Sequence, residues 1–206
     1  MSIKILGGFA RGQLLEVPKG DLIRPTSVML RRRVFDFFQS LEGVVFVDLC
    51  AGSGAMGFEA WSRGAVHVYF NEVSKQVIRI LEENRENLLL SNHHKKVGEI
   101  SCSHFPAEKW IKSFRNIYEN FTEEQKNETI IFIDPPYSEK KIYEEVIEQL
   151  IKEPWFFGQL WIESDPQKGI PREHWEKRGL ICAKLFEQGD NYIYVTNFPQ
   201  GNENMK

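Results

Sequence analysis

The sequence of 206 residues predicts an α/β fold: a mostly parallel, seven-stranded sheet with helices on both faces. From residue 44 onwards, apolar runs typical of buried strands alternate with segments of helical periodicity. The segment VVFVDLCAGSGAMG at residues 44–57 has the pattern of a buried strand, a tight glycine turn and the start of a helix. Two further strands flank Gly189-Asp190 near the end of the chain, which indicates a closing hairpin.

The first 40 residues are expected to form a hairpin and a helix outside this repeating pattern. Strands at residues 3–6 and 13–17 flank a glycine-rich loop, which is either a mobile, positively charged tip for a nucleic-acid backbone or an ordinary turn. A helix is expected over residues 27–39, with Thr26 or Ser27 as its N-cap. Its apolar residues at helical spacing are expected to face the body of the protein: Leu30, Val34, Phe37 and Phe38.

Strands and helices then alternate along the rest of the chain. Strands are expected at residues 44–49, 66–70, 97–102, 129–133, 158–163, 180–186 and 191–198. Helices are expected at residues 55–63, 75–90, 107–118 and 140–152. The polar segment 116–128 has no apolar stripe, so its later part is expected to be an exposed loop. Ligands of such sheets bind at the carboxyl ends of the strands, where the strand order reverses.

The charge of the chain is distributed unevenly. The net charge is −3, but residues 1–33 hold seven basic residues against two acidic ones, a net charge of +5, which leaves −8 on the remainder. A basic arm on an acidic body is typical of a protein that contacts phosphate with one face. On charge alone, a merely solvated arm is an equal alternative.

Three scattered cysteines and the absence of long apolar runs point to an ordinary intracellular protein. Cys50, Cys102 and Cys182 are too few for a disulfide framework or a zinc site, so we expect reduced thiols and no bound metal. The sequence shows no secretory signal and no stretch that approaches the ~20 apolar residues of a membrane span. We therefore expect a cytoplasmic protein without a membrane partner.

The glycine turn is the first candidate ligand site. Gly52 and Gly54 have no side chains and allow a ligand to lie against bare backbone at the start of a helix. Glycines at this spacing, with an acid about 20 positions later, also occur in dinucleotide-binding folds, and Glu72 stands at that place. The glycine spacing alone therefore leaves the ligand open.

A second motif, Asp-Pro-Pro-Tyr at residues 134–137, follows the apolar strand 129–133. Together with the upstream Asp-x-x-x-Gly-x-Gly turn that begins at Asp48, it resembles the amino methyltransferases that use S-adenosylmethionine. The resemblance implies a Rossmann-like class I methyltransferase fold, in which the closing hairpin makes the last strand antiparallel. It further implies that Asp48 meets the amino group of the cofactor and that Glu72 binds the ribose diol. The remaining implied cofactor contacts are Ala51, Gly52, Ser53 and Gly54 in the backbone cradle. Related enzymes usually carry Asp or Asn for the adenine just after the third strand; here Ser103 or His104 is expected in that place, with a stacking or apolar contact from Val73 or Phe105.

The second motif also suits methyl transfer to an exocyclic amine, whose delocalised lone pair is a poor nucleophile. Asp134 and the carbonyl of Pro135 can both accept hydrogen bonds from the amine and hold it in line with the methyl group. Successive prolines, Pro135 and Pro136, fix the backbone that carries this carbonyl. Tyr137 offers a ring on which the base can stack.

The resemblance becomes specific when the N-terminal motifs are added. The segments are Ile5-Leu6-Gly7-Gly8, Arg11-Gly12, Arg24-Pro25-Thr26, Arg31, Phe35, and DLCAGSGAMGFEAWSRGA at residues 48–65. They resemble the bacterial enzymes that methylate N2 of guanine 966 in 16S ribosomal RNA. The resemblance implies an assembling small ribosomal subunit as substrate and an RNA grip formed by Arg11, Arg24, Thr26, Arg31 and Arg32.

These inferences define two regions and leave alternatives. Residues 1–40 are expected to form an RNA-contacting extension and residues 41–206 the S-adenosylmethionine-dependent methyltransferase domain of a monomer. The alternatives are an adenine-N6 methyltransferase, a non-catalytic RNA-binding module that keeps the fold, and, more distantly, a nicotinamide oxidoreductase. An adenine-N6 DNA enzyme usually needs a further recognition domain, for which about forty residues leave little room.

Overall fold

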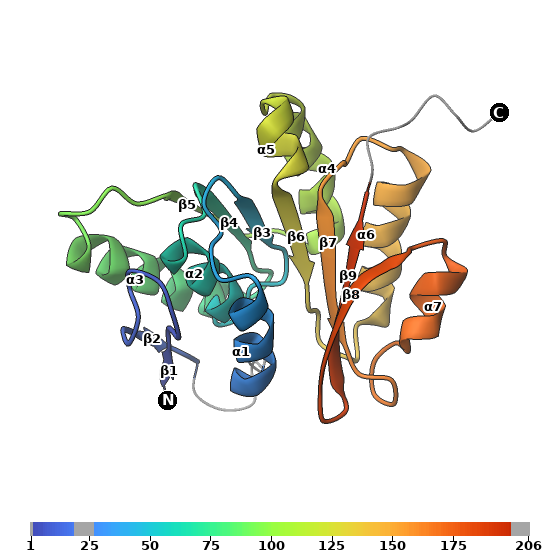
Figure 1. The fold of residues 1–206 in the computed structure, drawn as a ribbon, viewed down its shortest axis with the longest axis horizontal. Helices are drawn as coiled ribbons and strands as arrows, with labels where there is room; N and C mark the ends of the chain where they lie inside the picture. Colours follow the sequence, from blue (N-terminus) through green and yellow to red (C-terminus); the bar gives the residue numbers. More distant parts are fainter. Residues whose placement is uncertain (1, 19–26, 199–206) are drawn as a thin grey trace.

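The computed structural model describes residues 2–18 and 27–198 (Figure 1). Its central feature is a seven-stranded sheet with the strand order β5-β4-β3-β6-β7-β9-β8. These strands are β3 (Val45–Asp48), β4 (His67–Asn71), β5 (Glu99–Ser103), β6 (Thr129–Ile133), β7 (Gln159–Ser164), β8 (Cys182–Gln188) and β9 (Asn191–Asn197). The predicted seven strands are thus all present, with ends that differ from the expected ones by at most a few residues.

The sheet is parallel except around β9. β3 pairs in parallel with β4 and β6, and β5 and β7 extend the parallel sheet at its two sides. β9 is inserted antiparallel between β7 and β8. The chain therefore reverses its strand order between β3 and β6, which places a ligand crevice at the carboxyl ends of these two strands. The prediction of an antiparallel last strand is confirmed.

Helices cover both faces of the sheet because its side chains alternate between two apolar cores. Phe46, Phe132 and Trp161 point into one core, with α1 (Val28–Phe37), α2 (Ala55–Ser62) and α3 (Lys75–Ser91). Val47 and Ile133 point into the other, with α4 (Ala107–Glu119), α6 (Lys140–Lys152) and α7 (Arg172–Lys177). The expected helices after residue 44 are all present.

Two short helices were not predicted. α5 (Glu123–Asn127) stands where an exposed loop was expected, and Thr122 and Gln125 form a capping box at its start. α7 lies between β7 and β8, and its indole at Trp175 is fully buried. Among the described helices, none combines the length and apolar character that crossing a bilayer requires.

The N-terminal hairpin of β1 (Ser2–Lys4) and β2 (Leu14–Glu16) packs on the outside of α2 and α3. The backbone of Glu16 exchanges two hydrogen bonds of 2.8 Å with the amide of Asn84 on α3. Figure 1 shows the hairpin in blue beside these helices. The predicted hairpin is therefore present, and it is fixed to the body.

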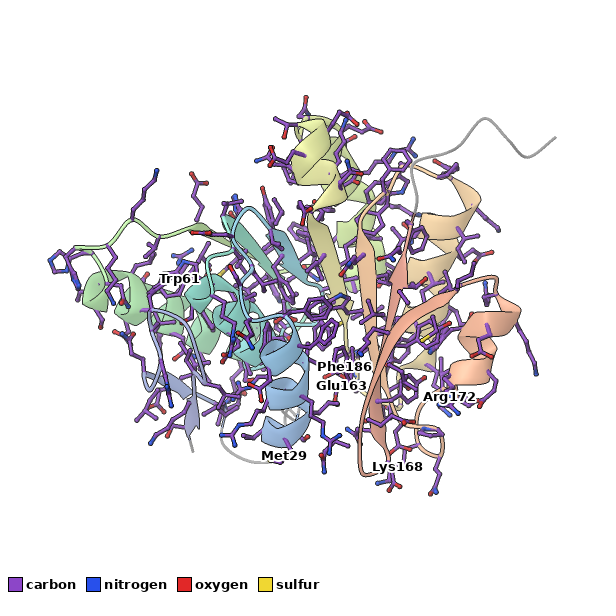
Figure 2. All side chains as sticks on the ribbon, in the orientation of Figure 1. Met29, Trp61, Glu163, Lys168, Arg172 and Phe186 are labelled. Atoms are coloured by element: carbon purple, nitrogen blue, oxygen red, sulfur yellow. The ribbon has the colours of Figure 1, made fainter. Side chains whose placement is uncertain are left out.

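The loop of this hairpin is docked, so the expectation of a mobile tip is wrong. Ser62, at the end of α2, binds the loop three times: its carbonyl accepts from Phe9 N at 2.8 Å, and its hydroxyl accepts from Ala10 N and donates to the Gly7 carbonyl. The ring of Phe9 packs edge-on against Trp61, labelled in Figure 2, at 4.7 Å. Gly8 adopts φ 72°, and a side chain there would meet the backbone of α2.

Helix α1 begins after Ser27, whose hydroxyl accepts a hydrogen bond from Leu30 N at 3.0 Å. Of the two predicted N-cap residues, Thr26 and Ser27, it is therefore Ser27 that caps α1. Leu30, Val34 and Phe35 are fully buried, whereas Phe37 is 56% exposed. The expected inward position of Phe37 is wrong, because its ring lies at the sheet edge against Phe186 of β8.

Candidate active site

A cavity of about 420 Å³ lies at the carboxyl ends of the parallel strands. The segments that form its wall follow β3, β4, β5 and β6, and Glu163 contributes from the end of β7. The lining includes both predicted motifs: Asp48, Ala51, Gly52 and Ser53 from the glycine turn, and Asp134, Pro135, Pro136 and Tyr137 from the second motif. The structure thus brings together two motifs that are some eighty positions apart in the sequence.

The glycine turn is shaped by backbone conformations that favour glycine. Gly52 and Gly54 have φ values of 51° and 72°. A side chain on Gly54 would come within 2.7 Å of the Phe58 ring, and Gly54 N donates to the Ala51 carbonyl at 2.7 Å. Gly54 does not itself line the cavity, so its role in the described structure is to turn the chain into α2.

Asp48 is buried at the end of β3, and its carboxyl group faces the start of α2. Its Oδ2 accepts a hydrogen bond of 3.0 Å from Gly57 N, in the first turn of that helix. Burial raises the pKa of Asp48 to about 8; the Gly57 hydrogen bond opposes this shift, and the charges of Glu72 and Glu163 add to it. Asp48 thus caps the helix and also lines the cavity.

Glu72 joins the end of β4 to the glycine turn. One carboxylate oxygen accepts from Gly52 N at 2.9 Å and the other accepts from Ser74 N at 2.7 Å. Its side chain also lines the cavity and is 9% exposed. A diol bound beside the turn would therefore meet an acceptor that two backbone amides already hold in place.

Cys50 shows how acidic this cavity is. Cys50 is partly buried, and burial raises the pKa of its thiol well above the ordinary value, with further increases from the negative charges of Glu72, Asp134 and Asp48. These three carboxyl groups face one thiol from three different strand ends. Such a cavity favours a ligand that carries positive charge.

The side of the cavity assigned to adenine differs in part from the prediction. Val73 and Phe105 line the cavity, whereas Ser103 and His104 do not. Ser103 is the last residue of β5, and its carbonyl accepts a hydrogen bond from Glu72 N. His104 contacts the Val73 carbonyl through Nε2 at 2.9 Å. The described positions therefore favour Val73 and Phe105 as an apolar slot and remove Ser103 from the cavity wall.

Asn71 and Glu163 line the cavity and were missed in the sequence. The Asn71 amide donates to the carbonyls of Leu49 and Phe105, at 3.1 and 3.0 Å, and so ties together the ends of three strands. Its Oδ1 is buried and has no hydrogen-bond partner among the residues that the structure describes. Glu163 is 2% exposed and accepts a hydrogen bond from the Asn191 amide at 3.3 Å. Both are polar residues at the end of an apolar strand, and this sequence pattern could have predicted that they line the cavity.

The predicted RNA-contacting residues occupy different environments. Arg11 and Arg32 are exposed on the surface. Arg24 and Thr26 lie outside the residues that the structure describes. The assignment of Arg31 to a surface contact is wrong, because its side chain is 1% exposed and donates to the carbonyls of Lys4 and Ala55. Burial lowers the pKa of this guanidinium.

The strand order, the inserted antiparallel strand and the position of the cavity define a class I methyltransferase fold. Among solved structures, yhhF of Escherichia coli, which carries a provisional methyltransferase assignment, superposes with a TM-score of 0.69 at 24% identity, over 97% of this chain and 99% of that one. Trm1 from Pyrococcus horikoshii, solved in complex with S-adenosyl-L-methionine, superposes with a TM-score of 0.62 at 12% identity, over 98% of this chain and 62% of that one.

The family follows from the sequence comparison. The model of the family described as Conserved hypothetical protein 95 matches residues 3–180, and the chain belongs to this family. The protein named Ribosomal RNA small subunit methyltransferase D of Escherichia coli strain K12 is 29% identical over 196 residues, which cover 90% of each chain.

Proposed function

We propose that this protein transfers a methyl group from S-adenosylmethionine to the exocyclic N2 amine of a guanine in 16S ribosomal RNA during assembly of the small subunit. The observation that carries the proposal is the single cavity lined by both the glycine turn and Asp134-Pro135-Pro136-Tyr137. The relative named as a small-subunit ribosomal RNA methyltransferase supports the substrate class. We further expect the protein to act as a cytoplasmic monomer.

The residues of the cavity fit S-adenosylmethionine. Gly52 and Ser53 present backbone to a ligand, and the fixed carboxylate of Glu72 is suited to a ribose diol. Val73 and Phe105 offer an apolar slot for an adenine ring. The negative charge around Cys50 favours the positive charges of a sulfonium and an ammonium group. When bound, this group supplies an electrophilic methyl carbon.

Methyl transfer requires the protein to orient the amine. It does not require a strong base to deprotonate the amine. The Asp134 carboxylate and the Pro135 carbonyl each can accept a hydrogen bond from the amine, which directs the nitrogen lone pair away from both acceptors. The buried, φ-restricted Pro135 limits the freedom of this carbonyl. The half-buried ring of Tyr137 lines the cavity, where it can stack on a base that has been turned out of its RNA helix.

RNA binding is assigned to the N-terminal extension. Arg11 and Arg32 are exposed cations on the hairpin loop and on α1, and Arg24 and Thr26 stand between them in the sequence. Exposed arginines bind phosphate oxygens without regard to base sequence. These residues would therefore position the RNA, and the choice of base would fall to the cavity.

The test combines a cavity variant with mapping of the product. Asp134→Ala is expected to reduce methyl transfer to ribosomal RNA at least a hundredfold, while calorimetry finds cofactor affinity within a few fold of the unmodified protein. Glu128→Ala, exposed just before β6 and therefore at the opposite end of that strand from the cavity, is the matched control and should leave both values unchanged. The substrate would be small subunits from a strain that lacks the gene, with the methylated base mapped afterwards.

Two results would contradict the proposal. Failure to bind S-adenosylmethionine, with tight binding of a nicotinamide dinucleotide instead, would exclude the cofactor. Methylation of an adenine amine in place of a guanine amine would keep the chemistry and reject the substrate.

A further inference from the structure

The carboxylate of Glu163 lines the cavity and has no role in binding the cofactor or in orienting the amine as proposed above. It comes from β7, next to the strand that carries Asp134, and β6 and β7 pair in parallel with Ile133 opposite Ile162. The next residues of the two strands are Asp134 and Glu163, and both line the cavity. Neighbouring strands lie about 4.8 Å apart. Two carboxylates from adjacent strand ends are thus presented to the same space.

The position of Glu163 is fixed from two sides. Its backbone carbonyl accepts a hydrogen bond of 2.6 Å from the Tyr143 hydroxyl on α6. Its Oε1 accepts a hydrogen bond from the Asn191 amide on β9, and donation of this kind favours the ionised acceptor. Glu163 is 2% exposed and lines the cavity, so its carboxylate faces the cavity and not the open surface. Figure 2 labels Glu163 at the lower end of the sheet, where β7 ends.

Guanine and other bases with an exocyclic amine differ at the atom beside that amine. In guanine, N1 carries a hydrogen and is a donor next to the N2 amine. In adenine, and in 2-aminopurine, N1 is an acceptor next to the amine. A carboxylate accepts hydrogen bonds and cannot donate when ionised, so it attracts the guanine edge and repels the other two.

We propose that Glu163 selects guanine by accepting a hydrogen bond from N1–H while Asp134 accepts one from the adjacent N2 amine. The two carboxylates then read two neighbouring donors on the same edge of the base. This inference rests on the proposed function and adds the residue that decides which base is methylated. Glu163 takes no proton in the reaction; it positions the base and rejects bases whose N1 is an acceptor.

The experiment uses a substitution that exchanges acceptor for donor. Glu163→Gln keeps the size of the side chain and gives it an N–H group that can donate to an unprotonated N1. The substrates are small subunits rebuilt with guanine or 2-aminopurine at the position that the unmodified protein methylates. Both bases keep the N2 amine, so only the hydrogen at N1 and the group at position 6 differ. Glu128→Gln, on the surface just before β6, serves as the control variant.

We expect the unmodified protein and the control to methylate guanine at least about tenfold faster than 2-aminopurine, because a site built around a donor rejects an analogue that lacks it. Glu163→Gln is expected to slow methylation of guanine and to bring the preference below about threefold or to reverse it. Calorimetry with S-adenosylhomocysteine is expected to give an affinity within about threefold for all three proteins.

The outcomes separate this inference from the proposed function. Equal rates of the unmodified protein on the two bases would overturn the role of N1–H, and that measurement needs no variant. An unchanged preference in Glu163→Gln would also overturn it, as would a loss of cofactor affinity of more than tenfold, which would assign Glu163 to the cofactor. If the unmodified protein methylates no guanine at all, the proposed function itself fails.

Discussion

Asp48→Asn is predicted to stabilise the protein increasingly, relative to the unmodified protein, as the pH rises from 5 to 8. Folding raises the pKa of Asp48 from its ordinary value of 3.8 to about 8, chiefly through burial. The folded state therefore binds a proton between these values that the unfolded chain has already released. The stability that this proton contributes is complete below pH ~4 and is lost progressively as the pH rises to ~8. Asparagine has no proton to lose, and its carbonyl can still accept the Gly57 N–H.

The size of the effect follows from the number of pH units. One proton bound only in the folded state changes the free energy of unfolding by about 1.4 kcal/mol per pH unit. Between pH 5 and pH 8 the unmodified protein would thus lose up to about 4 kcal/mol relative to the variant. Titrations common to both proteins cancel in this difference, so the comparison isolates Asp48.

Urea denaturation of both proteins at four pH values between 5 and 8 measures this difference. The gap in free energy of unfolding is expected to widen steadily as the pH rises. Asp190→Asn, at the exposed turn between β8 and β9, is the control and should follow the unmodified protein. A constant gap between Asp48→Asn and the unmodified protein would refute the reasoning, because it would mean that Asp48 is ionised in the folded state throughout this range.

Four further substitutions test the packing around the site and the proposed RNA surface. Gly57→Ala would place a methyl group 2.3 Å from the Phe70 ring, so chemical denaturation should show a loss of about 1–3 kcal/mol. Glu59→Ala removes a buried acceptor, and the same assay should show a loss of about 3 kcal/mol or more. Arg31→Met should lower the melting temperature but leave the salt dependence of RNA binding unchanged, whereas Arg32→Met should reduce that salt slope by about one without affecting melting. A reduced slope with Arg31→Met would return that residue to the RNA surface.

The fold was largely predictable because the sheet is built from strongly apolar strands. The strand at residues 129–133 is fully buried and has the predicted bounds. The helix at residues 140–152 also has the predicted bounds. Such segments have one favourable arrangement, since both faces of the sheet are covered. The position of β9 between β7 and β8 is a long-range pairing, and the sequence indicated it only through resemblance to a known family.

The errors concern contacts that exist only in the folded chain. Arg31 follows Leu30 on the inner side of α1, but arginine is normally exposed, and its partners are carbonyls from β1 and α2. The docking of the hairpin loop also depends on a contact between distant residues. Nothing in the sequence around Gly7 indicates that its carbonyl binds the hydroxyl of Ser62. α5 is different: its capping pair, Thr122 and Gln125, was visible in the sequence and was overlooked.

The two predicted halves of the cavity were found because each motif has its own local signature. Glu163 lacked such a signature, since a single acid after an apolar strand is compatible with many roles. Its significance depends on the neighbouring strand, which brings Asp134 to the same level. The division into residues 1–40 and 41–206 stays a prediction.

The docking of the hairpin has a consequence for how the chain can be shortened. Glu59 is completely buried on α2. One of its carboxylate oxygens accepts a hydrogen bond of 2.7 Å from Leu6 N, and the other forms an ion pair with Arg63. A fragment beginning at residue 41 would therefore leave an acid half-solvated on α2 and the Trp61 ring without its Phe9 neighbour. The N-terminal strands and α2 have to be transplanted, truncated or exchanged with a homologue as one unit.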